Sequence, residues 1–483
     1  MIRVIKLLLL LHFVTAASGQ PVPGNPADKW NIVRCVDYAL KNNISVRQTD
    51  LQSRFSELSY KQDKASQLPT LNFSSSTGYR LGRSENPTTG VLEDNNFFNL
   101  GMQLQSGVTI FNWFSKKNTI EASRLSWEAD KQQIQKAKDD IALNVAVAYL
   151  QILLAKEQAN LAGVQVGQTK EQLSNARKRV DAGVLPELNA AELEAQLARD
   201  SSSLIAAESS ALQFLLQMKA LLNLDAGAAF DIETPPVDRI PVDALADLQP
   251  DAVYALAIGM MPQQKVNTLR IQSAQKSAAA AKAMMYPAFS AFGGLGTNYV
   301  NVKIPDYNIG PFKPTGAVVN VAGTDYSVVA PSFVQVGERS IPLGKQFNNN
   351  FAQNIGISLI VPILNGRSAR TAWERSRLTV QQAELQKELG DMQLKQDIYK
   401  AYTDAVAAMQ KFNADKKSVQ TAEKAYDFAK KRYDLNLLST YDLISSQNNV
   451  LRAKIQALYS QYDYVFKMKL LEFYKGQGLK LAP

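Results

Sequence analysis

Four stretches of the chain alternate apolar and polar side chains with a period of two, the pattern of a β-strand whose faces meet different surroundings. They run over about 69–81, 97–111, 287–300 and 347–364. In the second stretch one face carries only Asn, Gln, Gly and Thr, and the other face is apolar. The apolar set is Phe98, Leu100, Met102, Leu104, Val108 and Ile110. The chain therefore contains strands that separate an apolar medium from a polar one.

Periodicity alone does not distinguish a half-buried soluble sheet from a membrane barrel. Strands of about 9 to 13 residues, aromatic residues near strand ends and an uncharged polar face together favour the barrel. Four strands cannot close, and open edges are not tolerated in lipid, so several chains must combine. Two copies would give eight strands with a filled interior, whereas three would give 12 strands and a water-filled lumen.

Two proline-free segments predict very long helices, at 113–182 and 366–434. Each would be on the order of 100 Å long at 1.5 Å per residue. Apolar and small residues recur every seven positions in both, which predicts left-handed supercoiling against partner helices at close approach. The first seam includes Val145, Ile152, Ala148, Ala155, Ala162 and Thr169, and the second includes Ile398, Ala401, Ala405 and Ala408.

Each long helix is followed by a short turn and a returning helix, at 186–223 and 439–475. Gly183 and Asn436 suit the left-handed conformation that ends a helix, and Pro186 suits the start of the next one. Ser439 with Asp442 resembles a capping box that has Asp in place of Glu or Gln. Two helical hairpins are expected.

The two halves of the chain are a duplication. A shift of 253 residues superimposes the long-helix segments without a gap, and a shift of 218 superimposes the segments before them. The difference is an insertion of 35 residues between 297 and 347, which we expect to enlarge an extracellular loop. The predicted organisation is a signal peptide at 1–19, a first repeat at 20–224, a linker at 225–249 and a second repeat at 250–483.

Composition removes most enzyme classes. The N-terminal residues have a short basic region, an apolar run and a small-residue end, the plan of an export signal. The only histidine, His12, lies inside that signal, and Cys35 is the only cysteine. The mature chain can build neither a Ser-His-Asp site, nor an imidazole zinc site, nor an internal disulfide. We expect no enzymatic activity, no metal and no cofactor.

On these residues the chain resembles the TolC family, the trimeric outer-membrane channel-tunnels of bacterial drug-efflux and type I secretion systems. The resemblance covers about 30–476. Three kinds of segment carry it: helices that end in proline before strands, the strand end at 361–366, and the turns at 178–183 and 431–436. Their order and their duplication together make the resemblance specific.

The resemblance implies an α+β membrane protein. Three chains would form a homotrimer with a 12-stranded outer-membrane barrel and a periplasmic tunnel of coiled-coil hairpins. Its partners would be a periplasmic adaptor (a membrane fusion protein), an inner-membrane RND or ABC transporter, and outer-membrane lipid, with no nucleic acid. The channel would conduct substrates passively to the exterior.

The resemblance also implies where the periplasmic entrance and the adaptor-docking tips lie. The candidate residues are Gly183, Asn189, Tyr433, Asn436, Leu438 and Asp442. Tyr433 matches a family tyrosine that helps to hold the entrance closed, and Asp442 matches an Asp ring in the lumen. Leu438 and Asn189 stand where the ion-pairing Arg and Asp would be, so the ionic latch is expected to be absent. For Asp442, a three-fold acidic ring and a simple helix cap stay equally open.

Two other classes compete with a channel. A periplasmic adaptor-like coiled-coil scaffold also has long hairpins, but it would have one hairpin and no lipid-facing strands. A carboxylate-pair hydrolase is the other alternative, although no clustered acidic motif supports it.

Overall fold

The computed structural model describes residues 29–85, 90–94, 96–235, 240, 242–435 and 437–476. The predicted signal peptide and Asn436 lie outside these ranges. The chain divides into two compact units. We call Met1–Glu57, Leu125–Ile271 and Gln381–Pro483 the helical unit, and Leu58–Arg124 with Gln272–Val380 the strand unit.

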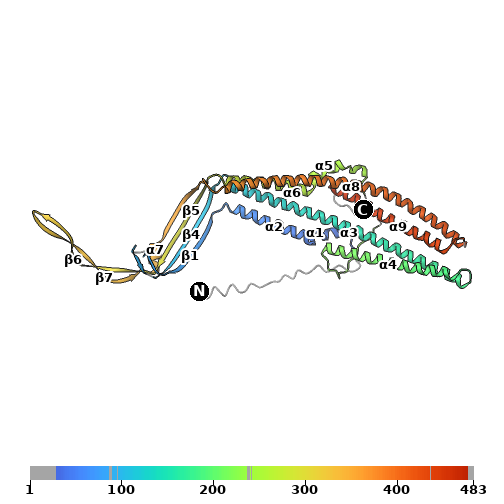
Figure 1. The fold of residues 1–483 in the computed structure, drawn as a ribbon, viewed down its shortest axis with the longest axis horizontal. Helices are drawn as coiled ribbons and strands as arrows, with labels where there is room; N and C mark the ends of the chain where they lie inside the picture. Colours follow the sequence, from blue (N-terminus) through green and yellow to red (C-terminus); the bar gives the residue numbers. More distant parts are fainter. Residues whose placement is uncertain are drawn as a thin grey trace. The chain divides into compact units, whose positions relative to one another are not determined.

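The strand unit contains an antiparallel sheet of four strands, in the order β1-β4-β5-β8 (Figure 1). The strands are β1 (Thr70–Arg80), β4 (Phe97–Phe111), β5 (Ala288–Val300) and β8 (Ala352–Ile360). Two strands come from each half of the chain, and β4 pairs with β5 across the duplication. Within the described residues, β1 and β8 each have one neighbour only, so the sheet has two open edges.

The register places apolar and polar side chains on opposite faces of this sheet. Phe73, Leu104 and Leu295 lie side by side on one face, and Ser74, Gln103 and Gly296 on the other. The apolar face is uncovered, because Phe73 is 66% exposed and Ile355 is 93% exposed. The alternation in the sequence therefore marks a sheet with one unpartnered apolar face.

The last strand is shorter than the predicted 347–364. Helix α7 (Leu343–Asn349) occupies the start of that range, and β8 ends at Ile360, two residues before Pro362. Proline cannot donate a hydrogen bond to a strand ladder, so the pairing stops before Pro362 although the alternation in the sequence continues.

The insertion is not an irregular loop. Apart from α7, it forms one long hairpin of β6 (Lys303–Val321) and β7 (Thr324–Ser340). Ala322 and Gly323 both have positive φ, at 57° and 88°, as a two-residue type I′ hairpin turn requires. A small pair, β2 (Arg83–Glu85) with β3 (Leu92–Asp94), lies between β1 and β4.

The helices repeat along the chain with the two offsets of the sequence. The pairs α1 (Ile32–Asn42) and α5 (Pro250–Met260), and α2 (Ile44–Ala65) and α6 (Pro262–Ala283), start 218 residues apart. The pairs α3 (Ser115–Asp181) and α8 (Ser368–Asp434), and α4 (Glu187–Leu222) and α9 (Thr440–Tyr474), start 253 residues apart. A short 3-10 helix, η3 (Leu245–Leu248), precedes α5. Within the described part of the chain, no helix is both long and apolar enough to cross a bilayer.

Each long helix begins after the same unusual backbone. Trp113 and Phe114 have φ of 53° and 62°, and their repeat equivalents Gly366 and Arg367 have φ of 59° and 64°. Two consecutive left-handed residues turn the chain sharply from strand to helix. Only glycine adopts this conformation without cost, so the aromatic pair is held there against its preference.

The heptad seams are buried in the middle of the long helices. Val145 and Ile152 of α3, and Ile398 and Ala405 of α8, are fully buried. Nearer the turn, the second seam is only half-buried at Phe412, Val419 and Tyr426. The two helical cores of the unit gather around the buried middle portions. Cys35 lies in the first core, and burial raises the pKa of its thiol to about 12, as expected for a packing residue.

The linker is hydrogen-bonded to a carboxylate of α9 that also belongs to a buried ion pair. Lys469 Nζ lies 2.7 Å from Glu472 Oε2, and both side chains are only 3% exposed. Glu472 Oε1 accepts a hydrogen bond of 2.9 Å from the backbone N–H of Asp243. The Glu472 carboxylate thus holds both a buried ammonium group and the linker backbone.

We expect Glu472→Gln to destabilise the helical unit by about 3–5 kcal/mol, because it leaves the Lys469 ammonium buried without an anion. Glu423→Gln is the matched control: it breaks an exposed ion pair with Lys454 and should cost at most about 1 kcal/mol. Thermal unfolding followed by circular dichroism measures both. Equal losses in the two variants would contradict the assignment.

Candidate functional site

The turn between α3 and α4 depends on one left-handed residue. Gly183 has a φ of 73° and lies two residues after Asp181, the last residue of α3. Backbone hydrogen bonds of 2.8 Å run from Gly183 N–H to Val180 O and from Val184 N–H to Arg179 O, which satisfies carbonyl groups at the end of the helix. Pro186 then stands at the N-cap of α4. The predicted reversal at Gly183 is present.

The turn between α8 and α9 ends in a side-chain cap. Ser439 is the N-cap of α9, and its Oγ accepts a hydrogen bond of 3.1 Å from the Asp442 N–H. The Ser439 hydroxyl in turn donates to Asp442 Oδ2 at 2.7 Å. The Asp442 side chain is exposed. Ser439 therefore caps the helix, and the Asp442 carboxylate supports this cap with one oxygen, which leaves its second oxygen for other contacts.

Within the described residues of the helical unit, three pairs of side chains form hydrogen bonds between the two hairpins. Asn189 Nδ2 donates to Thr440 Oγ1 at 2.8 Å. Farther from the turns, Gln196 Nε2 donates to Asn448 Oδ1 at 3.2 Å, and Gln172 Nε2 donates to Tyr426 Oη at 3.1 Å. All six groups are uncharged at neutral pH. We refer to these three contacts as the inter-hairpin hydrogen bonds.

A small apolar cluster and a buried carboxylate support these contacts. Ala176, Leu193 and Ile444 are buried together. The Asp200 side chain, in a residue that is 5% exposed, accepts hydrogen bonds of 2.7 Å from Thr169 Oγ1 and from Gln196 Nε2. It thereby orients the Gln196 amide toward the second hairpin.

The seam between the hairpins also contains unsatisfied polar groups. Both amide atoms of Gln447, which is 3% exposed, and Oε1 of Gln172 have no hydrogen-bond partner among the described residues. A cavity of about 270 Å³ is lined by Gln447, Gln165 and Tyr426, among others. Buried polar groups beside such a space are normally hydrated. The seam is therefore less tightly packed than the helical cores.

Two further predicted residues, Tyr433 and Leu438, lie at the turn between α8 and α9. The Arg179 guanidinium carbon lies 6.0 Å from the centroid of the half-buried Tyr433 ring. Leu438 is half-buried between the turn and α9. The resemblance to the family implied an uncharged residue in place of an ion-pairing Asp at Asn189, and its neutral amide forms the contact to Thr440.

Sequence reasoning missed Thr440, Gln196 and Asn448. Their partners lie on different hairpins, and pairing across hairpins is not visible in a heptad pattern. One signal was present: Asn189 and Thr440 are 251 residues apart, and Gln196 and Asn448 are 252 apart, close to the repeat offset. Equivalent positions of a duplicated hairpin thus face each other.

The tips also expose apolar side chains. Val184, Leu188, Leu437 and Tyr441 are 58%, 65%, 64% and 69% exposed. They surround both turns, where they would face a partner rather than the interior of the chain.

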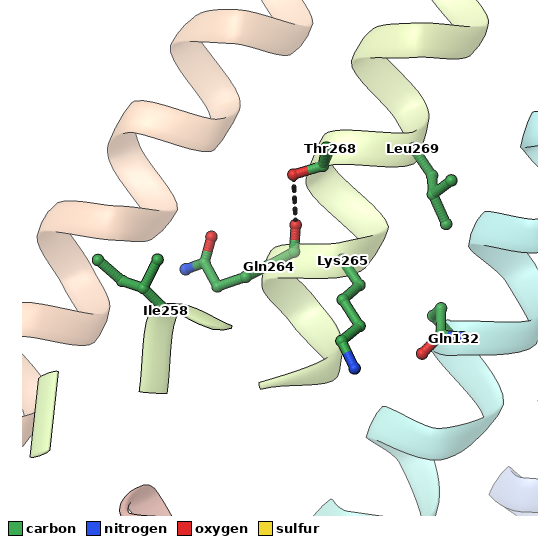
Figure 2. Close-up of a pocket in the computed structure, with 6 residues that line it drawn as sticks. All are labelled: Gln132, Ile258, Gln264, Lys265, Thr268 and Leu269. Atoms are coloured by element: carbon green, nitrogen blue, oxygen red, sulfur yellow. Dashed lines mark hydrogen bonds between the residues drawn. The ribbon is translucent and has the colours of Figure 1, made fainter. Parts of the chain in front are cut away.

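The described part of the helical unit has a shallow hollow beside α6. Its volume is about 330 Å³. Figure 2 shows Leu269 of α6 on the side of Gln132 of α3, and Gln264 of α6 on the side of Ile258 of α5. The Thr268 hydroxyl, which donates to the Gln264 carbonyl at 2.9 Å, serves the helix itself (Figure 2). Within the described residues, no group of three or more His, Cys, Asp or Glu side chains could hold a metal ion.

Comparison with known proteins agrees with this architecture. Residues 35–224 match the family model described as outer membrane efflux protein. The outer membrane efflux protein BepC of Brucella suis is 19% identical over 448 residues, which span 93% of this chain and 86% of BepC.

Solved structures share the fold along nearly the whole chain. CusC, studied for transmembrane channel formation, superimposes with a TM-score of 0.74 at 14% identity, over 94% of this chain and 98% of CusC. The outer membrane protein VceC of Vibrio cholerae gives 0.72 at 16% identity, over 92% and 96%. The resemblance and the α+β channel fold predicted from sequence are confirmed.

We expect Asn189→Leu to accelerate hydrogen exchange of backbone amides in the first turn of α9 by up to about tenfold, because one hydrogen bond contributes about 0.5–1.5 kcal/mol. The ratio to the wild type should be the same at pH 5 and pH 8, since neither Asn189 nor Thr440 titrates in that range. Glu194→Gln, on the same helix but bonded to Arg177 in its own hairpin, is the control and should leave these amides unchanged. A ratio that depends on pH would indicate an ionic latch instead.

Proposed function

We propose that this chain, a member of the outer membrane efflux proteins, is one protomer of a homotrimeric channel-tunnel in the bacterial outer membrane. The observation that carries the proposal is the sheet with two open edges and an uncovered apolar face. An open edge leaves unpaired backbone N–H and C=O groups that lipid cannot satisfy. Three copies of the β1-β4-β5-β8 sheet, joined edge to edge, give 12 strands and a water-filled lumen.

Aromatic side chains at both ends of the sheet support a membrane position. At one end Tyr79, Phe98 and Tyr299 lie next to one another, and at the other Phe111 lies beside Trp113 and Phe114. Phe98 and Phe111 are 13 residues apart on β4, about 43 Å along the strand. A tilt of about 45° reduces this to about 30 Å across the bilayer, close to the spacing of the two aromatic girdles of such barrels.

The polar face of the sheet would line the lumen, and the helical hairpins would continue the conduit into the periplasm. The channel would conduct passively, with energy supplied by an inner-membrane RND or ABC transporter through a periplasmic adaptor. The exposed apolar side chains around the two turns are suited to adaptor docking. At rest, the inter-hairpin hydrogen bonds would hold the entrance closed.

The scaffold alternative lacks support in the fold. A periplasmic adaptor-like coiled-coil scaffold needs one hairpin and no sheet with an uncovered apolar face. This chain has two hairpins and four such strands.

The proposal is tested by extracting the mature protein from membranes and measuring its oligomeric state and its conductance in planar bilayers. We expect a trimer that needs detergent to stay in solution and that forms water-filled pores. A monomer that is stable in water without amphiphile would contradict the proposal.

For Asp442 we propose a ring of three carboxylates in the entrance. Asp442→Asn keeps an oxygen that can accept from Ser439, and so preserves the helix cap while it removes the charge. We expect the cation preference of the pore, read from the reversal potential in a salt gradient, to fall. Asp427→Asn, exposed on α8 and paired with Lys431, serves as the control. An unchanged reversal potential in Asp442→Asn would leave this residue as a helix cap alone.

A further inference from the structure

The β6–β7 hairpin exposes a continuous apolar surface in its middle. Ile309 faces Phe333 across the two strands, and Phe312 and Tyr307 extend the same face. These four side chains and Val329 are between 50% and 73% exposed. We call Tyr307, Ile309, Phe312, Val329 and Phe333 the hairpin's apolar face.

The opposite face is different in the same region. Asn308 faces Val334, and Lys313 faces Ala330. On this face β6 contributes polar side chains, whereas Val334 and Ala330 of β7 are apolar but smaller than the aromatic residues of the apolar face. A two-stranded hairpin by itself is marginally stable in water, and the stretch from 326 to 337 contains no charged residue. Without a cover, such a strand is an aggregation hazard.

The edges of the hairpin are unsuited to strand addition. Pro305, Pro311 and Pro314 interrupt β6, and its register shifts after Asp306, Ile309 and Pro314. Proline and bulges block pairing with a further strand. The face, rather than the edge, is thus the part that can be covered.

Charge and backbone chemistry narrow the choice of partner. Between Lys313 and Glu338 the only charged residue is Asp325, so the hairpin lacks the cationic cluster that an anionic headgroup or polyelectrolyte needs. Burial in lipid would leave the unpaired outer edges of β6 and β7 without hydrogen bonds. An uncharged, aromatic surface fits best a second surface of the same kind.

We propose that the apolar faces of the β6–β7 hairpins from neighbouring copies of this chain pack against one another. The inference rests on the proposed trimer, which brings three hairpins to the same end of the barrel. Where the three apolar faces meet at the three-fold axis, they would bury about 500 Å² per chain, or about 1,500 Å² in all, which exceeds the roughly 1,000 Å² that a specific interface requires. The hairpins then form a collar beyond the aromatic residues Tyr79, Phe98 and Tyr299.

Neighbouring residues on β7 provide a matched test. In a Cys35→Ala background, Phe333→Cys places a thiol on the apolar face, and Val334→Cys places one on the opposite face. Membranes that contain each variant are treated with a short bismaleimide. We expect cross-linked dimers, the largest product that one thiol per chain allows, from Phe333→Cys and only monomers from Val334→Cys on denaturing gels.

A second pair of variants tests the energetic role. Phe312→Asp with Phe333→Asp should lower the temperature at which the trimer dissociates, whereas Val334→Asp should leave it near the wild-type value. Folding is checked by the helical circular dichroism signal, which the hairpin does not supply.

The possible failures are distinguishable. If native gels show a trimer but Phe333→Cys and Val334→Cys cross-link equally or not at all, the collar is wrong and the proposed function stands. If Phe333→Cys does not cross-link, and a lipid-attached quencher reduces the fluorescence of a label on this cysteine, the face contacts lipid. That result would also overturn the collar. A monomer on native gels would overturn both proposals.

Discussion

The structure depends on one constraint: backbone hydrogen-bonding groups at the edge of a sheet must find partners where water is absent. The sheet leaves β1 and β8 without outer neighbours and turns apolar side chains outward. No rearrangement within one chain closes four strands. In the proposed channel, assembly is therefore part of folding, and the number of strands per chain sets how many copies are needed.

The long helices are held together by packing in their middle and by side-chain hydrogen bonds nearer their turns. Alanine-rich seams allow close approach along the middle of α3 and α8, where Val145, Ile152, Ile398 and Ala405 are fully buried. Toward the turns, packing gives way to uncharged hydrogen bonds such as Asn189 to Thr440. Breaking a neutral pair costs less free energy than breaking a buried ion pair, because neither partner is left as an unpaired buried charge. A seam of this type is suited to repeated separation.

Much of this architecture could be predicted from the sequence, because period-two and period-seven patterns reflect the two media and the helical seams directly. The strand at β4 and the reversal at Gly183 follow from local chemistry. The end of β8 at Ile360 could not be predicted, because the alternation continues past Pro362. The hairpin at 303–340 could not be predicted either, because irregularly spaced prolines obscure the pattern of β6. Contacts such as Gln196 to Asn448 depend on how two hairpins are placed, which no single-segment pattern contains.

The equal lengths of α3 and α8, 67 residues each, limit how the protein can evolve. An insertion of one heptad in a single long helix would displace its turn by about 10 Å and separate side chains such as Asn189 and Thr440. Only matched changes in both halves, and in both returning helices, would keep the tips level. The duplicated helices must therefore change length together, and the reach of the tunnel can change only by paired mutations. Relatives with longer or shorter helices should differ by matched insertions or deletions in both halves.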